Sequence, residues 1–204
     1  MSRTVDALLP LSLLEAVRAV DLPVIDPDTE FVGELRSKRL GLSETVHAQI
    51  RRYHDAARRS QRTSTEEVAA LARLIGRRPD AEQVFRAAGR YLAERAYEKI
   101  PVSTRGLVHR MPRLLSRPLA LRQLRRLARR YFAGTVARHG ASLVLEIPSP
   151  VTSLTGRLAA GCAYYEAGMS ELLRLLLGSE RAVEHVHCAS REEGRCQWTV
   201  EWST

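Results

Sequence analysis

The chain has few of the residues on which several protein classes depend. It contains three cysteines in 204 residues, and an odd number argues against a disulfide framework. We therefore expect a cytoplasmic protein whose thiols stay reduced. No apolar run approaches the roughly 20 residues that span a bilayer, and residues 1–10 lack the pattern of a secretory signal. We expect residues 1–204 to form a single domain without a membrane span.

Motifs that carry common enzyme chemistry are also missing. Neither G-x-G-x-x-G nor G-x-x-x-x-G-K occurs, so no glycine-rich loop is available to hold phosphates. The sequence has no nucleophile elbow and no motif that would hold a hydride donor. We therefore expect a protein without catalytic activity.

Charge is distributed unevenly along the sequence. Lysine occurs only at Lys38 and Lys99, arginine supplies the other basic residues, and the net charge is +9. Residues 99–145 contain ten arginines and no acidic residue. Such a stretch could meet nucleic acid, anionic lipid or an acidic partner. A solvated helix face is the simpler interpretation, and we rank nucleic-acid binding last among the functions considered below.

Helical periodicity dominates the first 140 residues. Residues 1–40 are expected to form a helical extension, with a helix from Ala7 to Val20, ahead of a main region at 43–204. Within that region the spacing of apolar residues, capping residues and prolines predicts helices that start at Ser43 and span Ser64–Ile75, Pro79–Ile100, Ser103–Met111 and Pro118–His139. The last of these carries an apolar stripe through Phe132 and Val136, and Gly140 is its expected end.

The pattern changes after Gly140. Ser142–Ile147 is typical of a buried strand. A helix is expected from Ser153 to Leu177, ended by Gly178. Val183–Cys188 and Gln197–Trp202 then predict the two strands of a β-hairpin.

The three cysteines fall on this last helix and on the hairpin. They are Cys162, Cys188 and Cys196, and His185 lies three residues before Cys188. Thiolates and imidazoles are preferred ligands of tetrahedral zinc, and structural zinc sites usually have four of them. Three cysteines and one histidine make that number. The alternative is that the cysteines are small buried apolar residues.

The order of features from Leu143 to Trp202 is similar to that of a known family. A strand is followed by a helix bearing Gly161-Cys162 and Gly168, then by the stop at Gly178, a strand, Cys188, a turn with Gly194, Cys196 and an aromatic strand. This arrangement resembles the 4-vinyl-reductase domain, with residues 142–202 as its motif-bearing part. That domain occurs in bacteriochlorophyll-biosynthesis proteins and in sensor modules of phenol-responsive activators, and it is related in fold to subunits of the transport-protein-particle (TRAPP) tethering complexes.

The resemblance implies both a fold and a metal site. The fold is α+β, with a helical layer packed on a small antiparallel sheet that ends in a helix and a cysteine-bearing hairpin. The site is a structural zinc held by Cys162, His185, Cys188 and Cys196, with His185 where the family usually has glutamate. Glu184 and His187 are the alternative fourth ligands. A closed set of four ligands leaves no position for substrate or activated water, which argues against a zinc hydrolase.

Two functions of different classes follow from these features. The leading hypothesis is a non-enzymatic sensor that binds a small apolar, aromatic or tetrapyrrole-like ligand and signals through a homodimer or a downstream protein. Its candidate pocket residues are Phe132, Tyr164, Tyr165 and Trp198, for which core packing is the simpler interpretation. The runner-up is a TRAPP-like dimeric scaffold or assembly factor, for example in bacteriochlorophyll biosynthesis.

Overall fold

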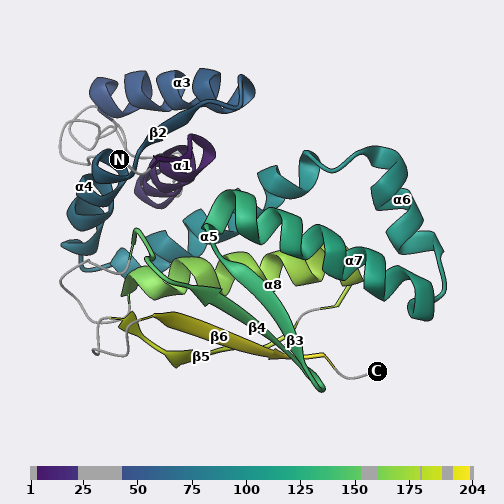
Figure 1. Cartoon of the computed structure of the whole chain (residues 1–204). Coiled ribbons are helices and arrows are strands. Elements are labelled where there is room, and N and C mark those ends of the chain that lie inside the picture. Colours follow the sequence, from purple (N-terminus) through teal and green to yellow (C-terminus); the bar gives the residue numbers. More distant parts are fainter. Residues whose placement is uncertain (1–3, 23–42, 153–159, 180, 190–194, 203–204) are drawn as a thin grey trace, which may run out of the picture.

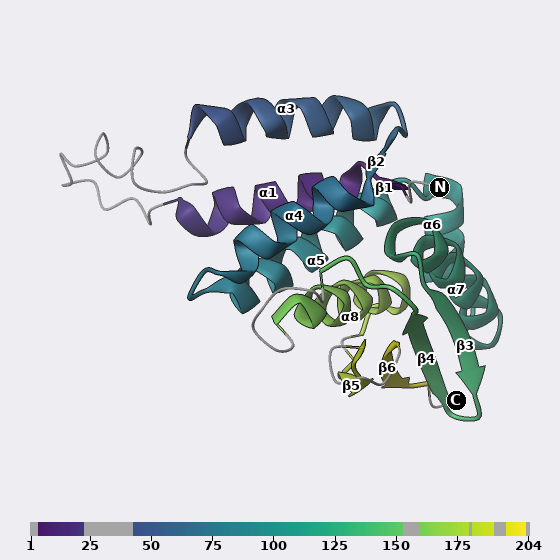
Figure 2. The same ribbon diagram turned by 60° about the vertical axis from the view of Figure 1, so that its left-hand side comes forward.

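Helices are stacked on one face of an antiparallel sheet, and those from the first part of the chain lie farthest from it (Figures 1 and 2). The computed structural model describes residues 4–22, 43–152, 160–179, 181–189 and 195–202. This arrangement confirms the expected α+β class. In the described part of the chain, no helix combines the length and the apolarity needed to cross a bilayer.

The four strands of the larger sheet all lie in the second half of the chain, and the two short strands lie in the first half. The helices are α1 (Leu8–Asp21), α3 (Glu44–Arg58), α4 (Thr65–Gly76), α5 (Ala81–Glu98), α6 (Val102–Arg110), α7 (Arg113–Leu127), the π-helical turn η2 (Ala128–Phe132), the 3-10 turn η3 (Ala160–Cys162) and α8 (Ala163–Leu177). The strands are β1 (Thr4–Asp6), β2 (Arg62–Ser64), β3 (Thr135–His139), β4 (Ser142–Ile147), β5 (Val183–His187) and β6 (Cys196–Glu201).

The main sheet has the strand order β3-β4-β6-β5, and all its pairs are antiparallel. Alternate side chains of β4 and β6 are buried beneath the helices, as the period of two in a strand requires. These inner residues are Leu143, Leu145, Ile147, Cys196, Trp198 and Val200. The opposite face carries residues such as Glu146 and Thr199, which are only partly buried. The site described below lies between the inner face and α8.

Helices α5 and α8 cross at two glycines. A Cβ atom added to Gly89 would lie 2.1 Å from the carbonyl oxygen of Tyr164, and one added to Gly168 would lie 2.7 Å from Cζ of Phe132. Both positions therefore lack room for a side chain, and the two helix backbones approach closely. This crossing fixes α8 over the sheet (Figure 2).

The N-terminal helix α1 belongs to the core. Its residues Leu9, Leu11 and Leu13 are buried, and Ser12 Oγ lies 3.2 Å from the hydroxyl of Tyr164 on α8. The described part of the expected extension therefore packs on the main region, and residues 23–42 lie outside the described residues. A short sheet of β1 and β2, which the sequence did not predict, pairs the start of the chain with the segment before α4.

The segment from Pro118 to His139 is not one helix, and that prediction is wrong. Helix α7 starts earlier, at Arg113, and ends at Leu127, and η2 then leads into β3. Ala133 has a left-handed backbone (φ 52°), which ends the helical segment, and a Cβ on Gly134 would come within 2.9 Å of the Glu146 carbonyl oxygen. Gly140 (φ +59°) lies in the tight turn between β3 and β4 rather than at a helix end.

Other predicted boundaries are close to the observed ones. Ser43 and Ser64 cap α3 and α4, but Glu67 does not close a capping box, because its carboxylate accepts hydrogen bonds from Tyr53 and Thr63. Helix α8 starts at Ala163 after η3, and residues 153–159 of the predicted helix lie outside the described residues. Gly178, with φ +72°, ends α8 as expected.

Candidate metal centre

Three elements bring the cysteines together. Cys162 ends η3 and occupies the N-cap position of α8, Cys188 follows the last residue of β5, and Cys196 opens β6. All three side chains are buried. Because Cys196 pairs with Ile147 in the centre of the sheet, its side chain faces the inner side, toward the start of α8.

A bulge in β5 decides which of its side chains reaches the cysteines. His185 pairs with Trp198 and His187 pairs with Gln197, so Val186 is an extra residue between them. In a regular strand, His185 and His187 would share one face. The extra residue places His185 on the inner face and leaves His187 exposed.

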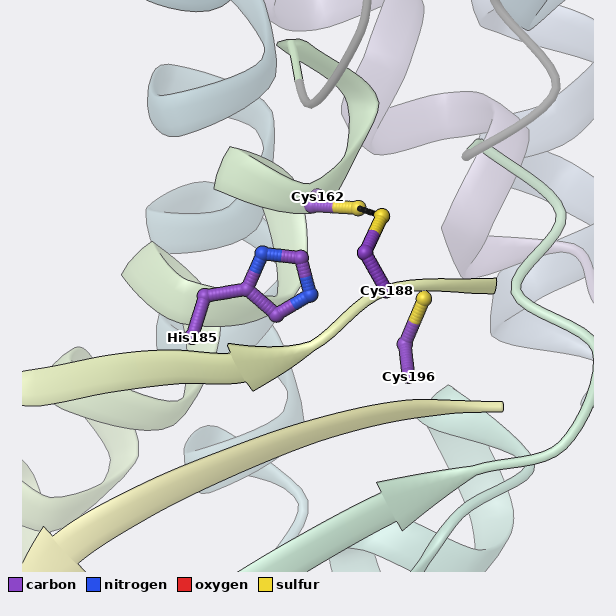
Figure 3. Close-up of side chains that lie close together, drawn as sticks. All are labelled: Cys162, His185, Cys188 and Cys196. Carbon is purple, nitrogen blue, oxygen red and sulfur yellow. Dashed lines mark hydrogen bonds between the residues drawn. The ribbon is translucent and has the colours of Figure 1, made fainter. Parts of the chain in front are cut away.

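The four side chains predicted as ligands form one compact group, which we call the Cys3His group. The ligand atoms of Cys162, His185, Cys188 and Cys196 all lie within 4.8 Å of one another (Figure 3). Glu184, the other alternative ligand, is exposed. It pairs with Thr199, whose side chain lies on the face of the sheet away from the helices. The described residues therefore place His185, and neither alternative, in the group.

The spacing of the sulfur atoms fits a tetrahedral metal. Sγ of Cys162 and Sγ of Cys188 are 3.8 Å apart, and the three cysteines are free thiols. Two thiolates bound to a tetrahedral zinc at about 2.3 Å would be separated by about 3.8 Å. Three sulfurs and one imidazole form a donor set that zinc accepts, so the residues present fit this metal.

Hydrogen bonding between the thiols changes the pKa values of Cys196 and Cys162 in opposite directions. The pKa of Cys196 is lowered to about 5, because the Cys162 thiol and the backbone N–H of Ala189 both donate to its sulfur. The pKa of Cys162 is raised, because its proton is held by Cys196 and because burial disfavours a thiolate. These contacts favour the thiolate of Cys196, and the thiolate is the form that binds metal.

His185 contributes a buried ring nitrogen to the group. Its Nε2 atom is buried and has no hydrogen-bond partner among the described residues. Leaving a buried polar atom unsatisfied costs about 1–3 kcal/mol, which coordination to a metal would remove. Figure 3 shows a ring nitrogen of His185 facing the sulfur atoms.

The four predicted pocket residues form an aromatic cluster beside this group. Phe132, Tyr164, Tyr165 and Trp198 are all buried and pack against one another, with neighbouring ring centroids 5.1–6.2 Å apart. This packing is the simpler interpretation offered by the sequence. A ligand could enter among these rings only if they separate.

Polar atoms of the cluster have partners that the sequence did not predict. The backbone N–H of Val151 donates to the Tyr165 hydroxyl at 3.0 Å, and the Tyr164 hydroxyl lies beside Ser12, 152 residues away in sequence. No local pattern marks these two contacts. Trp198 Nε1, in contrast, is buried without a partner among the described residues, and the ring of Trp198 stacks on His185 with centroids 4.8 Å apart.

No family model matches the chain. No curated protein matches it either. The geometry of the Cys3His group and of the aromatic cluster therefore carries the functional argument.

Proposed function

We propose that this chain is a zinc-braced, non-enzymatic sensor module of the 4-vinyl-reductase type. One observation carries the proposal: four side chains from η3, from β5 and the residue after it, and from β6, with the donor set of a structural zinc, converge within 4.8 Å. The metal would join the start of α8 to both strands of the hairpin. Its role would be structural, because four protein ligands leave no coordination position for substrate or water.

The aromatic cluster is the proposed ligand site. Its one unsatisfied donor, Trp198 Nε1, suits a small aromatic ligand with an acceptor oxygen, since such a ligand would satisfy the buried N–H. Trp198 also stacks on His185. A ligand that moves the Trp198 ring would therefore act directly on a residue that the metal holds in place.

The metal proposal is tested by zinc stoichiometry. Native mass spectrometry of protein produced with zinc should find one ion per chain, and a chelator should lower the stability of the fold. Cys162→Ser and His185→Ala should reduce the zinc content. Glu184→Gln and His187→Ala are matched controls that should keep it. A folded chain that carries no zinc, and that a chelator leaves unchanged, contradicts the proposal.

The ligand proposal is tested separately by calorimetry with the zinc-loaded protein. Phenol and protoporphyrin serve as small aromatic and tetrapyrrole probes. We expect saturable binding of one of them, weakened at least about tenfold in Trp198→Phe, because a bond to a buried donor contributes about 1.5 kcal/mol. Trp202→Phe, the other tryptophan, is the control. If neither probe binds at millimolar concentration, the ligand half of the proposal fails while the zinc half stands.

A dimeric scaffold is the second candidate, favoured by exposed apolar residues on α6 and in the first turn of α7. Val102, Leu107 and Leu115 are exposed, and exposed apolar side chains could contribute to an interface with a second copy of the chain. Light scattering after size-exclusion chromatography should then show a dimer that Leu107→Ser and Leu115→Ser dissociate. A monomer at all concentrations contradicts this function.

A further inference from the structure

The exposed side of α7 and η2 carries a groove lined almost entirely by arginine. Its volume is about 500 Å³, and its walls are Pro118, Arg122, Arg125, Arg126, Arg129 and Arg130. We call it the arginine groove. A smaller neighbouring hollow shares Arg126 and Arg130 and adds Lys99. The groove lies within the segment that has no acidic residue, from residue 99 to 145.

Two of the arginines are held in position by the fold. Arg125 Nε donates to the carbonyl oxygen of Val136 at 3.0 Å. Arg130 contacts Asp6 at 3.5 Å and Ser60 at 3.2 Å. Asp6 is the only carboxylate that the described residues place in an ion pair with the groove. The groove therefore presents guanidinium groups whose positions are partly fixed.

The other three arginines form no ion pair or side-chain hydrogen bond with any described residue. They are Arg122, Arg126 and Arg129, and all are exposed. Guanidinium groups that are crowded together repel one another, and their planar donors match the geometry of phosphate and of carboxylate. Residues 122–130 extend over about 12 Å of helix at 1.5 Å per residue. A single phosphate cannot contact such a row, whereas a chain of phosphates can.

We propose that the arginine groove binds the phosphate backbone of a nucleic-acid duplex without reading its bases. Unpaired bases usually stack on exposed aromatic side chains. The groove lining contains none, and the adjacent Tyr131 is buried. The lining also offers no large apolar side chain for insertion into a lipid surface. Phosphate contacts alone give binding that is independent of sequence and sensitive to salt.

The test compares two variants of equal charge. Arg122→Gln/Arg126→Gln/Arg129→Gln removes three charges from the groove, and Arg51→Gln/Arg58→Gln/Arg59→Gln removes three from α3 and its C-cap residue. Fluorescence polarisation with a short labelled duplex is measured over a range of salt concentrations. For five phosphate contacts, the slope of log K against log salt should be about −4.5. The groove variant should reduce the magnitude of this slope, to about −2, and the α3 variant should leave the slope unchanged.

Parallel measurements use the single strand of the same sequence and vesicles of phosphatidylserine in phosphatidylcholine. The proposal requires that the duplex binds more tightly than either, and that the groove variant weakens this binding selectively. Tighter binding to the single strand or to vesicles overturns it in favour of that partner. Equal loss in both variants, or no binding at low salt, also overturns it, since net charge would then explain any attraction. Urea midpoints of both variants confirm that each remains folded.

Discussion

Helix α8 is held on its two sides by different means. On the side of α5, Gly89 and Gly168 let two backbones meet, and this contact is complete as the chain folds. On the side of the sheet, its first turn meets β5 and β6 through the Cys3His group, which contains unsatisfied and shared polar atoms. The glycine contact therefore depends on shape, whereas we expect the second contact to depend on a bound ion and on protonation.

The strongest test of the glycine contact is Gly89→Ala. A methyl group there would overlap the Tyr164 carbonyl, and neither helix backbone can yield locally, so we expect a loss of about 4 kcal/mol or more in urea unfolding. Gly168→Ala should cost less, because the Phe132 ring can shift. Gly106→Ala is the control: nothing lies within 4 Å, and it should gain up to about 1 kcal/mol. A Gly89→Ala protein as stable as the wild type would show that the contact between α5 and α8 does not depend on a glycine at this position.

Removal of zinc tests the other side of α8. With free zinc at a hundred times the dissociation constant, binding should stabilise the fold by about 2.7 kcal/mol, and chelation should remove this. Cys162→Ser should unfold at the same urea concentration with and without zinc. A zinc effect that persists in Cys162→Ser would place the metal elsewhere.

Acid should weaken only the metal side. Thiolates bind zinc and thiols do not, so zinc stabilisation should fall as the pH is lowered from 7.5 to 5. In the metal-free protein the lowered pKa of Cys196 acts in the same direction: its contribution is complete above the unfolded pKa and is lost as the pH falls through about 5. The cost of Gly89→Ala should not change over this range. If the cost of Gly89→Ala fell with pH in parallel with the zinc stabilisation, the two contacts of α8 would not be held by different means.

The smallest expected effect concerns an ion pair across the α5–α8 contact. Arg86 and Glu166 are 2.7 Å apart, and both are partly exposed. Arg86→Gln should therefore cost only about 0.5 kcal/mol in urea unfolding. Arg95→Gln, which removes a pair within α5, is the matched control. A loss several times larger would mean that charge, and not only shape, holds this contact.

The sequence predicted the elements whose signals are local. Leucine spacing, serine caps and Gly178 gave α1, α3, α4 and the end of α8 close to their observed limits. The error at residues 118–139 arose because the apolar spacing through Phe132 and Val136 continues across the break. The left-handed Ala133 has no sequence signature, and Gly134 is required by a strand that is distant from α7. Pairing of β1 with β2 depends on a contact about 60 residues apart in sequence, which periodicity does not report.

The candidate site also combines features that have local sequence signals with features that depend on distant contacts. Residue type and spacing were enough to suggest all four members of the Cys3His group, and the resemblance supported His185 while Glu184 and His187 stayed open as alternatives. The reason that His185 and not His187 reaches the sulfurs is the bulge at Val186, which depends on pairing with β6. The sequence predicted the positive charge of the arginine groove but not its shape. A solvated helix face and a groove can have the same amino-acid composition, so composition does not distinguish them.

The bulge also bears on how copies of the chain meet. Strand β5 lies at the edge of the described sheet, and an edge strand with regular spacing is a template on which another chain can add a strand and polymerise. The extra residue Val186 interrupts that spacing, and the neighbouring Glu184 and His187 are exposed beside it. One added residue thus both brings His185 into the Cys3His group and makes this edge a poor seed for aggregation.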